Sequence, residues 1–168
     1  MINTQTYINN IVNDMESFTW TSVDGAGTSG FLAVYSFPMW EHDAGFPYLV
    51  ILDNPSGTST YSNADGEFLN NIEFHICANY SVVSGSTESD QREEAMLRIR
   101  EAYDALREYV FDDTNIDGWL SAPANAVRGS HSSMVWRKDD LGIEDNNIDE
   151  LNLYRRTLTL PITDIVNL

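Results

Sequence analysis

One segment near the middle of the chain restricts the fold more than any other. In SGSTESDQREEAMLRIREAYDALREYVF, residues 84–111, apolar side chains recur every three or four positions. The resulting stripe consists of Met96, Ile99, Tyr103, Leu106 and Val110. This spacing is typical of one face of an α-helix and predicts an amphipathic helix of about six turns. Because an apolar helix face must be covered by another layer, we expect this helix to lie on a sheet.

The expected start of this helix carries acidic side chains. Asp90 and Glu93 have the spacing of a capping box, in which each residue bonds the other's backbone N–H. Glu88 and Glu94 are close to the positive end of the helix dipole. Glu94 and Arg98, four residues apart, predict an ion pair on the exposed side.

Several other segments have the composition of β-strands. FLAVYSF (31–37) and PYLVILD (47–53) are rich in β-branched and aromatic residues. IEFHICANYS (72–81) alternates, and LNLYRRTLTLPI (151–162) alternates again, with Pro161 predicting a sheet edge at its far end. In the third segment the apolar set expected to face the core is Ile72, Phe74, Ile76, Ala78 and Tyr80.

The remaining segments complete an α+β arrangement. TQTYINNIVNDMESF (4–18) predicts a short amphipathic helix, and SVDGAGTSG (22–30) a glycine-rich turn. We expect irregular loops at about 54–67, as a polar excursion or a long hairpin tip, and at 112–150, with one strand at SSMVWR.

Short connections favour antiparallel pairing of the first three strands. The expected fold is thus a single domain spanning 1–168. It has one mainly antiparallel sheet of about four to five strands, with an N-terminal helix and one long central helix packed against it.

Charge is distributed very unevenly along the chain. The net charge is −17, and residues 1–91 contain 11 Asp and Glu but no Lys or Arg. Residues 92–168 hold all nine basic residues and 15 acidic ones. Non-specific DNA binding requires clustered cations, so this distribution argues against it. An acidic surface suits a basic partner or the basic half of another copy; solubility or adaptation to high salt explains it equally well.

Other broad classes are disfavoured by composition. The chain has one cysteine, Cys77, which cannot form an internal disulfide. No apolar stretch approaches membrane-spanning length, and no charged n-region precedes a hydrophobic run at the N-terminus. We therefore expect a soluble protein made in a cytoplasm, without a membrane partner.

The most suggestive chemical pattern is FHIC, in which His75 and Cys77 share one strand face with Glu73 and Asn79. A zinc site needs about four ligands, and no second pair such as C-x-x-C or H-x-x-x-H accompanies these two. A Cys–His nucleophile would need an activating helix N-terminus or oxyanion donor, which the pattern does not supply. We interpret the segment as a half-buried strand face, with a metal or enzymatic site as the alternative.

Two further patterns do not amount to sites. DGAGTSG lacks the G-x-G-x-x-G spacing and the following lysine of a phosphate-binding loop. DDTNIDGW (112–119) lacks the twelve-residue pattern of a calcium loop, and a solvated turn after the long helix is expected there. The sequence thus predicts no catalytic, cofactor-binding or metal-binding residues, and favours a non-enzymatic protein.

The order of elements resembles a known family. An N-terminal amphipathic helix precedes GFPYLVI and EFHICANYSV; a long helix, ESDQREEAMLRIREAYDAL, then runs into FDDTNIDGW, and YRRTLTLPI closes the chain. This arrangement is similar to the tail terminator and tail-completion (minor tail) proteins of tailed bacteriophages. The resemblance covers most of the chain by element order, and the segments 54–67 and 112–150 match no pattern of the family.

The resemblance implies a structural virion protein assembled in the host cytoplasm. Such a tail terminator forms a ring, usually of six subunits, that caps the tail tube and joins it to the neck or head–tail connector. An acidic lumen would let DNA pass without binding. A neck or head-completion protein of the same virion is the first alternative, and a non-viral acidic protein-binding domain is the second. An enzyme or metalloprotein built on Glu73, His75 and Cys77 is the third.

Four residues are candidates for the subunit interface. Arg155 and Arg156 on the last strand could meet the cation-free half of a neighbour, since a head-to-tail ring needs two complementary surfaces. Trp119 and Trp136 lie in the segment expected to be irregular and could anchor a contact, or equally cover the edge of a small core.

Overall fold

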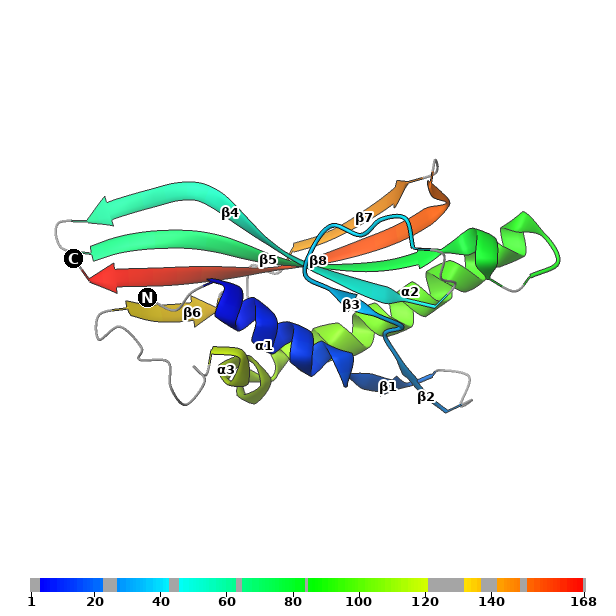
Figure 1. Cartoon of the computed structure of the whole chain (residues 1–168), viewed down its shortest axis with the longest axis horizontal. Helices are drawn as coiled ribbons and strands as arrows, with labels where there is room; N and C mark the ends of the chain where they lie inside the picture. The colour runs from blue at the N-terminus through cyan, green and yellow to red at the C-terminus, as the bar shows by residue number, and fades with distance from the viewer. Residues whose placement is uncertain are drawn as a thin grey trace.

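The computed structural model describes residues 4–22, 27–42, 46–62, 65–83, 85–120, 132–136, 142–148 and 151–167. It describes the backbone only at Thr4, Asp113, Asp117 and Leu120 and in the segments 54–62, 65–70, 132–136, 142–144, 146–148 and 162–167. The fold is α+β, as expected, with a mostly antiparallel sheet, an N-terminal helix and a long central helix (Figure 1).

The main sheet is built from long strands that run the length of the molecule. β4 (Tyr48–Ser62) and β5 (Asp65–Asn79) form an antiparallel hairpin, and β8 (Leu153–Asn167) pairs antiparallel with β5 on the other side. Three shorter strands complete it: β3 (Val34–Tyr35) beside β4, and β6 (Ser132–Trp136) and β7 (Gly142–Ile148), which both pair with β8. β3, β4, β5 and β8 lie in the four segments predicted to be strands, with β3 reduced to two residues. With β6 and β7 the sheet has six strands.

Helices cover one face of this sheet. α1 (Thr4–Glu16) and α2 (Glu88–Phe111) pack on it, and both bury the stripe that their apolar periodicity predicts. The sheet contributes the predicted face of β5, from Ile72 to Ala78 at alternate positions, to the same core, and Tyr80, in the short 3-10 helix that follows β5, joins it. On α2 the buried side chains are Ala95, Ile99, Ala102, Tyr103, Leu106 and Val110. Each fully buried aliphatic side chain here contributes about 1.5–3 kcal/mol to stability.

The start of α2 differs from the prediction by one turn. Thr87 is the N-cap, and its Oγ1 accepts a hydrogen bond from the backbone N of Asp90 at 3.2 Å. Asp90 lies in the first turn and accepts from Ser86 Oγ at 2.7 Å. The helix begins earlier because the Thr87 hydroxyl can serve as the cap that a box at Asp90 was expected to supply. The predicted Glu94–Arg98 ion pair forms, at 2.9 Å.

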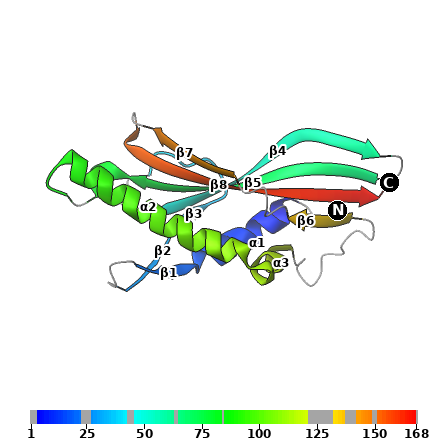
Figure 2. The same cartoon turned by 180° about the vertical axis from the view of Figure 1, so that it is seen from behind.

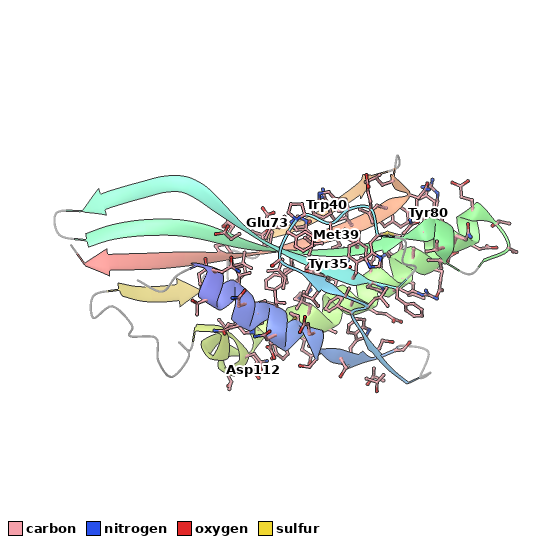
Figure 3. All side chains as sticks on the ribbon, viewed as in Figure 1. Tyr35, Met39, Trp40, Glu73, Tyr80 and Asp112 are labelled. Carbon is pink, nitrogen blue, oxygen red and sulfur yellow. The ribbon has the colours of Figure 1, made fainter. Side chains whose placement is uncertain are left out.

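The opposite face of the sheet carries a second, smaller core. Tyr48, Val50, Cys77 and Leu153 are buried there. β3 contributes Tyr35 to this core, and the segment that follows β3 crosses over it and contributes Met39 and Trp40 (Figure 3). This segment also explains why β3 pairs parallel with β4, against the antiparallel expectation. Twelve residues separate the two strands, enough for a crossover connection.

Two intervals expected to be irregular are mostly regular. Residues 54–62 and 65–67 continue β4 and β5, so the first interval is the outer part of a long hairpin, as one of its two expected forms held, and not a polar excursion. The interval 112–150 contains α3 (Asp113–Leu120), β6 and β7. β6 matches the strand predicted at SSMVWR. Strand pairing with β5 and β8 imposes the extended conformation on residues whose own preferences favour turns.

Pro161 lies inside the sheet and not at its edge. β8 pairs with β5 along its length, with Pro161 opposite Asn71. On its other side, the register with β7 ends at Thr159 and the register with β6 begins at Ile162. Pro161 therefore sits where the outer neighbour changes from one strand to the next, a position at which its missing N–H is tolerated.

α3 is tied to the other helices through one carboxylate. Asp14 Oδ2 of α1 accepts hydrogen bonds from Tyr109 Oη of α2 at 2.5 Å and from Trp119 Nε1 of α3 at 2.8 Å. Ile116 of α3 is buried in the same core. The segment 112–119 is thus a short packed helix and not the solvated turn predicted from its polar residues.

A separate two-stranded ribbon lies beside α2 (Figure 2). It consists of β1 (Thr19–Thr21) and β2 (Thr28–Gly30), paired antiparallel; β1 precedes the interval 22–30 in which a glycine-rich turn was expected, and β2 forms its end. Among the described helices, none combines the length and the apolar composition that a membrane span requires.

Candidate functional site

His75 is held on both sides by hydrogen bonds on the smaller-core face of β5. Its Nε2 lies 2.9 Å from Glu73 Oε2 on the same strand. Its Nδ1 lies 3.0 Å from Thr157 Oγ1 on β8, and His75 and Thr157 are opposite each other in the register. Because a carboxylate only accepts, Nε2 carries the proton, and in the neutral ring Nδ1 accepts from the Thr157 hydroxyl.

Trp40 covers this group from the segment that crosses the sheet (Figure 3). Its ring stands edge-on to His75, with centroids 5.3 Å apart, and the Arg155 guanidinium lies 4.9 Å from the Trp40 centroid. His75 and Thr157 are each only 6% exposed. Glu73, His75 and Thr157 have the residue types of a proton relay, but the hydroxyl of Thr157, which would be the nucleophile, is buried. The arrangement locks the register of β5 and β8 beneath Trp40.

Cys77 is fully buried beside this group. Burial raises the pKa of its thiol to about 12, and Sγ lies 3.6 Å from the carbonyl oxygen of His75. Since the thiolate is the form that attacks electrophiles and binds metals, Cys77 is not poised for either reaction at neutral pH. Within the part of the chain that the structure describes, no three His, Cys, Asp or Glu side chains gather to hold a metal ion. These side chains do lie on a strand face, but that face was expected to be half-buried and is almost fully buried, because the segment carrying Met39 and Trp40 covers it.

The two candidate interface arginines point to opposite faces of the sheet. Arg155 lies over Trp40 on the smaller-core face. Arg156 lies on the helix face, 5.0 Å from the Tyr103 ring centroid. It donates from Nε and Nη2 to Asp145 of β7 at 2.6 and 2.9 Å, which lowers the pKa of Asp145. Neighbouring strand positions alternate between faces, so the structure does not bring these two cations into one patch.

The two candidate interface tryptophans have different positions. Trp119 is 2% exposed, packs against Phe74 and Tyr109, and donates to Asp14, so the interpretation as an interface anchor was wrong. Its ring completes the core above the sheet, as the alternative interpretation held. Trp136 lies in β6 opposite Ile162 of β8, and its side chain falls outside the described residues.

The sheet presents two candidate contact edges that sequence reasoning missed. Figure 1 shows β4, β5 and β8 extending as an arm beyond α1 and α2, with β4 along one edge and β6 along the other. Within the described residues, the register of β3 with β4 covers only Leu49 and Val50. Among the described strands, the outer half of β4 has a ladder partner only in β5, and β6 only in β8. Unpaired strand edges accept another strand through backbone hydrogen bonds.

The glycines, serines and proline of NPSGTSTYSNADGE concealed this arm, because they favour turns in isolation. Only the alternation in 72–81 gave a signal that strands continued nearby.

The sequence was also compared with known proteins. The chain matches no model of a known protein family and no curated protein sequence.

Proposed function

We propose that this protein is a non-enzymatic assembly subunit of a tailed bacteriophage, a tail terminator that forms a ring, with six subunits as the expected number. The ring caps the tail tube and joins it to the head–tail connector, so the chain is located in the virion. The observation that carries this proposal is the arm of the main sheet, which presents two different edges, β4 and β6, that no other described strand covers.

Two unlike edges on one subunit suit a closed ring. A head-to-tail contact joins one surface to a different surface on the next copy, and such contacts close when the rotation between copies divides a full turn. Pairing of the outer half of β4 with β6 of a neighbour would make a heterologous contact of this kind. The element order that resembles tail terminators supports the same proposal. So does the net charge of −17, which lets DNA pass through a lumen without being held.

Light scattering and electron microscopy of the purified protein, at low and high salt, test the ring. A closed particle near six times the chain mass of 18.9 kDa supports the proposal. A protein that stays monomeric when it is mixed with tail tubes would contradict it.

The contact edge is tested by two lysines on β4, Thr58→Lys with Thr60→Lys, because charged side chains on an edge strand oppose strand addition. We expect loss of the ring with an unchanged circular dichroism spectrum. The matched control adds the same charge on the exposed side of α1, Asn9→Lys with Asn13→Lys, and should leave the ring intact. Equal loss in both variants would indicate a general charge effect and exclude the β4 edge as the contact.

A neck or head-completion protein of the same virion remains the nearest alternative, since it would also form a closed ring. The non-viral alternative, a domain that binds a basic protein, is favoured by one specific observation: an acidic groove along α2.

A further inference from the structure

A groove runs along the exposed side of α2, between this helix and the β1–β2 ribbon. It consists of two adjoining hollows of about 300 and 720 Å³, which share Trp20, Leu97 and Glu101 in their linings. Along α2 the lining extends from Glu94 to Asp112, about 27 Å at 1.5 Å per residue. That length matches about five turns of a second helix.

The floor of the groove is apolar and partly exposed. Phe18, Trp20 and Tyr109 form a connected aromatic group, with centroids 5.9 Å apart for Phe18 and Trp20 and 5.1 Å for Phe18 and Tyr109. Leu97 is 39% exposed, and Phe46, at the end of the smaller hollow, is 58% exposed. Large apolar side chains with this much exposure, gathered in one groove, are typical of a binding surface.

The rim of the groove is acidic. Glu101, Asp104 and Glu108 follow one another along α2 at spacings of three and four residues, so they share one side of the helix, and Asp112 follows at its C-cap. Two arginines also line the hollows, and one of them, Arg98, is bound to Glu94. Carboxylates therefore dominate the side that faces a bound chain.

One buried donor in this groove lacks an acceptor. Trp20 is 9% exposed, lines both hollows, and its Nε1–H has no hydrogen-bond partner among the described residues. A buried N–H without an acceptor costs free energy, and an acceptor supplied by a bound chain would recover part of that cost.

We propose that this groove binds a basic amphipathic segment of a different protein. Cationic side chains of that segment pair with the carboxylates on α2, and its apolar side chains pack on Trp20 and Leu97. A second copy is the poorer occupant because most described arginines are engaged within the chain or stand in the groove itself. Arg92, Arg98 and Arg156 bind carboxylates, Arg155 lies on Trp40, and Arg100 lines the larger hollow. The groove is separate from the sheet edges, so this inference does not depend on ring formation.

Fluorescence anisotropy with a labelled peptide tests the proposal. The probe is a helical peptide of about 18 residues, with leucines every three or four positions and arginines elsewhere, at about 0.1 M salt. We expect saturable binding that weakens about tenfold in Asp104→Asn with Glu108→Gln, since each exposed ion pair contributes modestly. The matched control, Glu16→Gln with Glu93→Gln, removes the same charge from exposed positions outside the groove and should change affinity less than about twofold.

A second peptide, with glutamine in place of each leucine, keeps the charge and should bind far more weakly. Equal weakening by both protein variants, or equal affinity for both peptides, would show attraction to the overall negative field and overturn the proposal. Groove-specific binding by a protein that forms no ring would support this inference while contradicting the proposed tail terminator.

Discussion

The carboxylate of Asp14 joins three helices, and its removal gives a stability prediction with a defined magnitude. In Asp14→Ala, Tyr109 Oη and Trp119 Nε1 both lose the acceptor that lies 2.5 and 2.8 Å away. Hydrogen bonds to charged groups are each worth about 1.5–3 kcal/mol, and both donors are part-buried. Because water can reach the vacated site in part, we expect the free energy of unfolding to fall by about 3 kcal/mol.

Urea denaturation followed by circular dichroism measures this change, with the m-value expected to stay constant. Glu16→Ala is the matched control, since it removes an exposed carboxylate from the same helix and should cost less than about 0.5 kcal/mol. A double-mutant cycle with Trp119→Phe, which keeps an aromatic ring but removes the donor, should give a coupling energy of about 1–2 kcal/mol. A loss below about 0.5 kcal/mol in Asp14→Ala would refute the reasoning that this carboxylate fixes α3.

Three further outcomes follow from the buried residues. Cys77 should resist thiol reagents in the folded protein at pH 8. Its folded pKa of about 12 exceeds the ordinary value of 9.0, so its contribution to stability is present below pH 9 and declines above it, at up to about 1.4 kcal/mol per pH unit. Cys77→Ala should flatten that decline; an unchanged slope would contradict the assignment. Thr157→Val removes the hydroxyl that bonds His75 and should cost about 1–2 kcal/mol in urea denaturation, whereas a neutral effect would show that the bond contributes nothing. Ile99→Ala should cost about 2–5 kcal/mol and the half-exposed Leu97→Ala much less, and equal losses would contradict the orientation of α2.

The sequence predicted those parts of the fold in which periodicity and burial agree. The α2 stripe and the alternation of 72–80 identified the helix-side core correctly, because each apolar set repeats at the period of its own secondary structure. The alternation did not reveal that the polar face of 72–80 is buried as well, beneath the smaller core. The helix start was misplaced by one turn, since Thr87 and Asp90 are both acceptable caps and only tertiary contacts decide between them.

The length of the outer hairpin and the helix α3 could not be predicted, and the reason is different. Residues 54–62 and 113–120 are rich in turn-forming side chains, and their conformations depend on partners far away in the sequence. For α3 the partner is Asp14, about a hundred residues earlier. The candidate contact surfaces share this dependence, because edges and grooves exist only after distant strands and helices have come together.

The pairing of β5 with β8 has a consequence for how the chain reaches this structure. Even their closest registered pair, Asn79 and Leu153, is 74 residues apart. Contacts of such long range are slow to form, so we expect refolding to be slow compared with that of helical proteins of similar size. Until β8 arrives, β5 presents its own open edge to other unfinished chains, which is the situation that promotes aggregation. The net charge of −17 makes those chains repel one another during this interval, so the acidity of the sequence also protects the protein while it folds.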